Sequence, residues 1–279
     1  NLTDIWDSTA IDWDTIEGLW NGPKALSATP DTLEFRFKTK GIPSSSYYSQ
    51  SLFQVNSGSN TQFGIQLLYP SASNSDYDSP ITNAIYSTYG ELRFFLSGSQ
   101  GYTKTNPIYF PFFSGSWWSV KLNRETGSIP LASTGSDNQY TLTVKSTDYD
   151  GKDGTYIKYA ASESLSIDGS SSASYNGSWN DFYFTSNNSD LYGYLGGTGS
   201  NNVLAQGNTK FDGFFQEFRL WSTVLSGSAF NQHVLDPRSI RSNQVTSSRF
   251  DLVYRLPLGN DLKISGSNGN NIITSVHPS

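Results

Sequence analysis

The stretch Thr32-Leu33-Glu34-Phe35-Arg36-Phe37-Lys38-Thr39 carries the clearest structural signal in this chain of 279 residues. Its apolar side chains, Leu33, Phe35 and Phe37, alternate with charged ones at the two-residue period of a β-strand. This pattern predicts a half-buried strand from Thr32 to Thr39, with one face turned toward a core.

The same alternation recurs along the chain in segments bounded by Ser, Gly, Asn or Pro. Its clearest repeats are the triplets Phe63-Ile65-Leu67, Leu92-Phe94-Leu96, Trp118-Val120-Leu122 and Tyr140-Leu142-Val144. Further strands are expected at residues 156–161, 182–185, 191–195, 211–221 and 252–256, and another at residues 15–20. A short helix is expected between an N-cap at Ser226 and Pro237. Many short strands with little helix predict an all-β antiparallel β-sandwich, or jelly roll, over most of the chain.

The composition excludes several classes of function. The net charge is −6, and no run of Lys or Arg could neutralise a phosphate backbone, so no nucleic-acid partner is expected. No stretch approaches the length of about 18 apolar residues that a spanning helix needs, so no membrane insertion is expected. The absence of cysteine excludes disulfides, thiol catalysis and Cys-ligated zinc.

Three segments resemble a known family. Residues 213–221, Gly-Phe-Phe-Gln-Glu-Phe-Arg-Leu-Trp, are similar to the closing strand of the concanavalin A-like superfamily, as found in laminin-G-like and pentraxin-like modules. Residues 32–38 resemble an early strand of that fold, and residues 115–124, Gly-Ser-Trp-Trp-Ser-Val-Lys-Leu-Asn-Arg, its central strand. The three segments also occur in the same order along the chain as the corresponding strands of that fold. The resemblance implies a concanavalin A-like antiparallel β-sandwich over residues 15–235.

The resemblance also divides the chain and suggests its setting. Residues 1–14 are expected to form an N-terminal segment, and residues 236–279 a C-terminal extension or a junction to a following domain. Residues 231–278 look similar to segments that follow such sandwiches in structural proteins of aquatic bacteriophages and large DNA viruses. This similarity implies a location on a virion or another extracellular surface, with other subunits of the assembly as partners. It also implies that the chain continues beyond Ser279.

Catalysis is not expected, although concanavalin A-like folds include glucanases. Retaining hydrolysis needs two neighbouring carboxylates, which that branch supplies from an E-x-D-x-E strand. None of the glutamates here begins such a motif. Glu217 is expected to be structural, with its carboxylate tied to a loop or to Arg219. His233 is expected to cap or pack the short helix, and His277 to be exposed or part of a junction.

Calcium is the more plausible ion, because hard cations take oxygen ligands from acidic turns. Asp148, Asp150 and Asp153 fall within six residues between two expected strands, which makes them the candidate metal ligands. The alternative is a hairpin loop that uses Asp and Gly only for its turn geometry.

Carbohydrate binding would need aromatic rings beside polar groups at a loop rim. Tyr149, Tyr102 and Tyr192 lie in or beside polar loops and are the candidate ligand-binding residues. Exposed tyrosines equally serve contacts between subunits. The favoured function is therefore a noncatalytic structural and carbohydrate-contacting domain of a virion or extracellular assembly. The alternatives are a purely architectural subunit without glycan binding and a degenerate glucanase.

Overall fold

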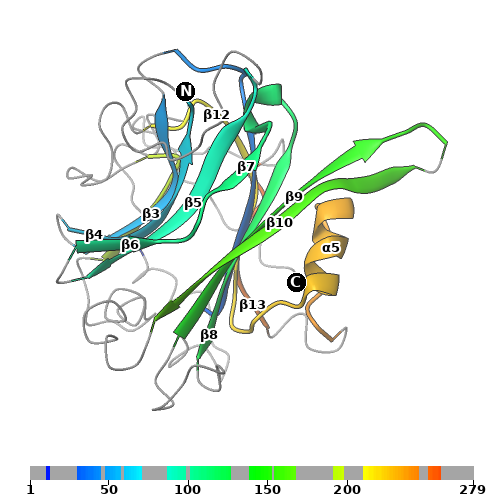
Figure 1. Ribbon diagram of the computed structural model, residues 1–279. Helices are drawn as coiled ribbons and strands as arrows, with labels where there is room; N and C mark the ends of the chain where they lie inside the picture. The colour runs from blue at the N-terminus through cyan, green and yellow to red at the C-terminus, as the bar shows by residue number, and fades with distance from the viewer. Residues whose placement is uncertain are drawn as a thin grey trace, which may run out of the picture.

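The computed structural model describes residues 11–12, 30–44, 48–57, 60–70, 87–98, 101–126, 138–152, 154–167, 191–197, 210–244 and 251–258. Within them, the chain forms two antiparallel sheets that pack on each other, with an α-helix beside one of them (Figure 1). The predicted all-β antiparallel sandwich with a short helix near the C-terminal end is confirmed. No helix in these residues is long and apolar enough to cross a membrane.

The first sheet has seven strands in the order β1-β11-β3-β4-β5-β6, and β7 pairs with β5. Its strands are β1 (Ile11–Asp12), β3 (Ser49–Ser57), β4 (Asn60–Leu68), β5 (Gly90–Gly98), β6 (Gly101–Lys104), β7 (Ile108–Phe110) and β11 (Leu191–Leu195). A single turn of 3₁₀ helix, η3 (Phe112–Ser114), follows β7.

The second sheet has six strands in the order β10-β9-β8-β2-β12-β13. Its strands are β2 (Thr32–Thr39), β8 (Trp118–Thr126), β9 (Asn138–Tyr149), β10 (Thr155–Ile167), β12 (Gly213–Trp221) and β13 (Leu252–Leu256). The predicted strand over Thr32–Thr39 therefore lies inside this sheet, paired with β8 on one side and β12 on the other.

Most of the expected strands are present in the described residues, and some have the expected bounds. The limits of β2, β11 and β13 match the prediction, whereas β10 extends well beyond residues 156–161. The expected strands at 15–20 and 182–185 lie outside the described residues. Strands β1, β3, β6 and β7 were not predicted. The division of the chain at residue 235 stays a prediction, and β13 from the later segment is paired with β12.

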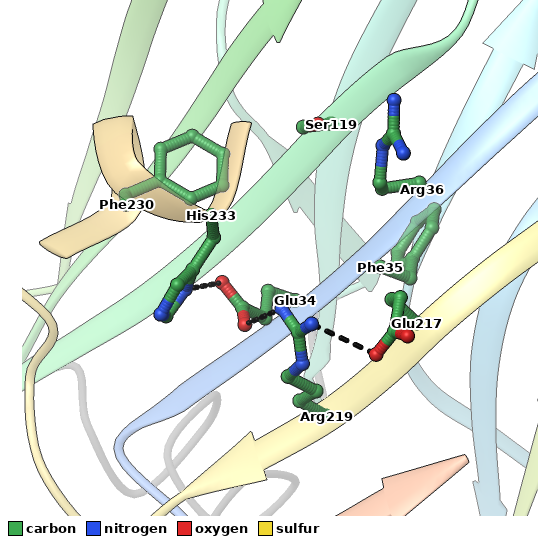
Figure 2. A pocket seen from close by; sticks show the side chains of 8 residues that line it. All are labelled: Glu34, Phe35, Arg36, Ser119, Glu217, Arg219, Phe230 and His233. Carbon is green, nitrogen blue, oxygen red and sulfur yellow. Dashed lines mark hydrogen bonds and ion pairs between the residues drawn. The ribbon is translucent and has the colours of Figure 1, made fainter. Parts of the chain in front are cut away.

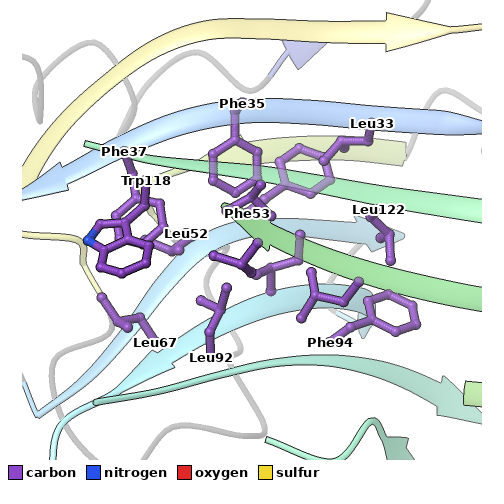
Figure 3. Close-up of a cluster of buried hydrophobic side chains, with 14 of the residues drawn as sticks. Leu33, Phe35, Phe37, Leu52, Phe53, Leu67, Leu92, Phe94, Trp118 and Leu122 are labelled. Atoms are coloured by element: carbon purple, nitrogen blue, oxygen red, sulfur yellow. The ribbon is translucent and has the colours of Figure 1, made fainter. Parts of the chain in front are cut away.

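The hydrophobic core lies between the two sheets and is rich in aromatic rings (Figure 3). From the six-stranded sheet, Leu33, Phe35 and Phe37 point inward, and each is at most 1% exposed. They meet side chains such as Phe53 and Phe94 from the facing sheet, which are fully buried. The apolar half of the alternating pattern therefore forms the core, as expected.

The helix α5 (Gly227–Leu235) covers part of the outer face of the six-stranded sheet. Ser226 caps it by accepting a hydrogen bond from the backbone N–H of Ala229 at 3.2 Å. Phe230 and Val234 are buried on its inner side. The helix ends at Leu235, immediately before Asp236 and Pro237, as predicted. Consequently, β2 is buried on both faces near α5. The sequence pattern had predicted a strand that is buried on one face only.

Candidate functional site

The hairpin formed by β9 and β10 extends beyond the body of the sandwich (Figure 1). Strand β8 accompanies β9 only as far as the pair Trp118 and Ser146. Beyond Ser146 no other strand pairs with the hairpin in the described residues, and α5 contacts both of its strands. The end of the hairpin, residues 147–157, is called the hairpin tip below.

Short polar contacts shape the hairpin tip. Lys158 Nζ lies 2.7 Å from Asp148 Oδ2, and the Asp148 Oδ1 atom accepts a hydrogen bond from the backbone N–H of Tyr149 at 2.9 Å. Asp150 Oδ1 accepts from the backbone N–H of Lys152 at 2.9 Å, which closes an Asx turn. Gly151 has φ of 78°, in the left-handed region that favours glycine. These contacts connect the two strands and the turn at the tip.

Tyr149 is more exposed than Tyr102, the other member of the predicted ligand-binding set whose side chain the structure describes. It is 67% exposed, and Tyr156 on the returning strand is 44% exposed. Tyr149 pairs with Thr155 and Tyr156 with Asp148, so the two rings lie on opposite faces of the hairpin. The tip therefore presents an aromatic surface on each side.

The structure does not bring the other two predicted tyrosines to this tip. Tyr102 lies on β6 in the other sheet, where it is half-buried and stands edge-on to Phe95, with ring centres 6.1 Å apart. Burial raises the pKa of its hydroxyl. Tyr192 lies on β11, paired with Asn56 of β3, and its side chain is outside what the structure describes. β6 and the hairpin tip lie at opposite sides of the molecule in Figure 1.

The predicted calcium site at the hairpin tip stays a prediction. Asp148 and Asp150 are both at the tip, and Asp153 is outside the described residues. The hydrogen bond from the Lys158 ammonium lowers the pKa of Asp148, so this carboxylate is ionised but already neutralised. A calcium ion bound to Asp148 would compete with Lys158 for this carboxylate. The turn geometry is that expected of the hairpin-loop alternative.

A second set of polar residues is buried between α5 and the six-stranded sheet (Figure 2). Arg219 on β12 bridges two carboxylates, with Nη1 2.8 Å from Glu34 Oε1 and Nη2 2.8 Å from Glu217 Oε2. His233 on α5 places Nδ1 3.0 Å from Glu34 Oε2. The four side chains are between 2% and 5% exposed. They are called the charge cluster below.

A β-bulge in β12 positions Glu217 within the charge cluster. The register of β12 on β2 shifts between Gln216 and Arg219, and Glu217 has φ of 56°. Such a bulge can redirect a side chain to the other face of a sheet. Glu217 then accepts from both Nε and Nη2 of Arg255 at 2.8 Å, which links β12 to β13. The expected tie between Glu217 and Arg219 is confirmed.

The charge cluster fastens the segment that follows α5. The other ring nitrogen of His233, Nε2, lies 2.8 Å from the carbonyl oxygen of Arg241. Arg219 Nη2 also donates to the carbonyl oxygen of Pro237. The indole of Trp221 stacks on the imidazole of His233 at an angle of 13° between the rings. Through these contacts, strands β2 and β12 hold α5 and residues 237–241 against the sheet.

The chemistry of the charge cluster is that of a structural ion pair. Burial alone would raise the pKa of Glu34, but Arg219 and His233 outweigh it and lower that pKa from 4.5 to about 2. A carboxyl group with this pKa cannot serve as a general acid near neutral pH. The cavity beside it has room for about one water molecule. The cluster therefore has the geometry of a clamp between α5 and the sheet.

The low pKa of Glu34 makes acid stability a test of this clamp. Because the pKa is lower in the folded chain than in the unfolded chain, unfolding takes up a proton at acidic pH. The contribution of Glu34 is complete above pH 4.5 and is lost as the pH falls toward 2, a difference of about 3 kcal/mol. Urea unfolding at several pH values should show this loss in the natural chain and not in Glu34→Gln. Equal losses in the two proteins would contradict the assignment.

Sequence reasoning placed only part of this geometry. The tie of Glu217 to Arg219 was expected, whereas the roles of Glu34 and Arg255 and the contact of His233 with Glu34 were missed. Glu34 and His233 are 199 positions apart, so no local pattern relates them. One signal was available in the sequence: Glu34 lies in a strand, β2, on which the helix that follows Trp221 packs.

Comparisons with known proteins include a structural likeness. No protein-family model matches the chain, and no curated protein matches it. Among solved structures, the chain is similar to the LG1-3 region of the laminin alpha2 chain, with a TM-score of 0.32 and 15% sequence identity. The match covers 68% of this chain and 27% of that chain. The sandwich architecture therefore rests on the strand pairing and the shared core described above.

Proposed function

We propose that this chain is a noncatalytic binding domain of a virion or another extracellular assembly, and that it contacts carbohydrate through the hairpin tip. The observation that carries the proposal is the exposure of Tyr149, 67%, at the end of a hairpin that projects from a rigid sandwich. An exposed ring on a fixed scaffold is suited to stacking on the apolar face of a sugar. Single contacts of this kind are weak and become effective when many copies act together.

The polar groups around Tyr149 complement that ring. Asp148, Asp150 and Lys158 all lie at or next to the tip, where they can exchange hydrogen bonds with sugar hydroxyls. Their mutual contacts and the Asx turn hold the tip in place before any ligand arrives. Binding to a preorganised surface loses less conformational entropy than binding to a mobile loop. Catalysis plays no part in this proposal.

A glycan array tests the proposal directly. The purified chain should be displayed as a multimer on the array, once with calcium and once with a chelator. The expected result is binding to a restricted set of glycans that the Asp150→Ala variant weakens. Binding that requires calcium would add the predicted metal site to the proposal. An array without any binding in either condition would overturn the carbohydrate contact and favour the architectural subunit.

A further inference from the structure

Within the described residues, strand β10 is the edge of the six-stranded sheet and has one side without a partner strand. It runs from Thr155 to Ile167, and in the described part of the chain it pairs with β9 alone. The N–H and C=O groups along the other side of an edge strand are a template for pairing with another chain. A strand of this length offers an unusually long template.

The usual means of protecting an edge are sparse along β10. The strand contains no proline, and its single irregularity lies near one end, between Ile157 and Tyr159. Its two charged residues are already engaged: Lys158 with Asp148 at 2.7 Å, and Glu163 with the side-chain amide of Asn106 at 3.3 Å. The stretch from Tyr159 to Ile167 therefore pairs regularly with β9, and its exposed positions carry only the small side chains of alanine and serine.

The two faces of β10 differ in character. Tyr159, Ala161 and Leu165 point inward and pack, partly buried, against the border of the core. Ser162 and Ser164 point outward, where they share hydrogen bonds with hydroxyls of β9 at 3.0 Å. A strand paired with β10 would cover the inward-pointing side chains. It would also extend the row of hydroxyl groups on the outer face.

We propose that a second copy of this chain occupies this edge, antiparallel to β10, with the two-fold axis of the dimer at Ser162. In this register Tyr159 of one copy lies opposite Leu165 of the other, and Ala161 lies opposite Glu163. Apolar residues of the inner face thus meet each other at the ends of the overlap, and no like charges face each other. An isologous contact requires this self-complementarity.

The neighbouring registers are less favourable, which points to Ser162 as the centre. An axis at Glu163 places two carboxylates directly opposite each other, which is destabilising. An axis at Ala161 places Glu163 opposite Tyr159 and leaves the carboxylate against an aromatic ring. If the pairing register were shifted by one residue and the axis stayed at Ser162, the inner face of one copy would lie beside the outer face of the other. The inference is independent of carbohydrate binding at the hairpin tip.

Single cysteines test the register, because the chain has no cysteine of its own. Ser162→Cys places identical thiols opposite each other at the axis, where Cβ atoms of antiparallel neighbours are about 4.5–5.5 Å apart. Ser164→Cys is the matched control, since Ser162 and Ser164 are both exposed and each shares one hydrogen bond with a threonine of β9. Under mild oxidation, Ser162→Cys should form disulfide-linked dimers at least about tenfold faster than Ser164→Cys.

Two further results complete the test. An equimolar mixture of Ala160→Cys and Ser164→Cys should crosslink, because these positions face each other in the proposed register. In sedimentation experiments across a concentration series, the natural chain and Ser164→Lys should dimerise, whereas Ser162→Lys, which puts two lysines at the axis, should not. Equal crosslinking of the two serine variants would overturn the proposal. A natural chain that sediments as a monomer at every concentration would also overturn it.

Discussion

Replacing Arg219 with methionine should lower the free energy of unfolding by about 3–5 kcal/mol, because it leaves two buried carboxylates without their shared partner. Arg219 is 2% exposed and lies 2.8 Å from both Glu34 and Glu217. Removal of its guanidinium leaves Glu34 with His233 alone and Glu217 with Arg255 alone. Urea unfolding at neutral pH measures the loss. The change should also release α5 and the segment after it, which hydrogen exchange of residues 227–241 would report.

An exposed ion pair provides the comparison for Arg219. Lys40 lies 2.6 Å from Asp212, but the two side chains are 60% and 36% exposed. Lys40→Met should therefore cost less than about 1 kcal/mol, because solvent screens the pair. Arg219→Lys should fall between the two, since one ammonium cannot reach both carboxylates as the planar guanidinium does. If Arg219→Met were no more harmful than Lys40→Met, the charge cluster would not be holding the helix.

Replacing Trp118 with alanine should cost about 3–5 kcal/mol, because it opens a large cavity in the core. The indole is fully buried and touches aromatic rings from other elements. Its ring centre lies 4.7 Å from that of Phe112 on η3 and 5.5 Å from that of Tyr159 on β10. Loss of these contacts should loosen the attachment of β10 as well as lower the midpoint of urea unfolding.

The neighbouring tryptophan is a matched control for Trp118. Trp117 is only half-buried, and its ring lies beneath the guanidinium of Arg36 at 5.3 Å. Trp117→Ala loses this cation–π contact, which is worth about 0.5–1 kcal/mol at such sites. The same chemical change should thus have very different effects at adjacent positions. Similar effects of the two substitutions would place the core elsewhere than between the sheets.

Strand β2, which sequence reasoning located with its exact bounds, has an intact period of two. In β2 the inward residues Leu33, Phe35 and Phe37 follow each other without interruption, and the register on β8 is regular throughout. β3 is different, because its register on β4 shifts between Ser51 and Phe53. The bulge places Leu52 and Phe53 in succession, both fully buried, so the apolar pattern no longer alternates. The strand therefore escaped detection.

The candidate sites show the same division between local and distant information. The hairpin tip could be anticipated, because Asp148, Asp150 and the nearby glycines are a local turn signal between two strands. The tie of Glu217 to Arg219 is also local. The pairing of Glu34 with His233 depends on how a helix packs on a strand almost two hundred positions away. That contact follows from the tertiary fold and not from any motif.

The most direct test of the proposed function compares two exposed rings on the same scaffold. Tyr149 is at the hairpin tip, whereas Phe214, 48% exposed, lies on β12, three strands away from β9 across the sheet. For a glycan identified on the array, the affinities of Tyr149→Ala and Phe214→Ala should be measured by calorimetry against the natural chain. We predict that Tyr149→Ala weakens binding about tenfold or more, a loss of about 1.4 kcal/mol, and that Phe214→Ala does not. Unchanged affinity in Tyr149→Ala would contradict the assignment of carbohydrate contact to the hairpin tip.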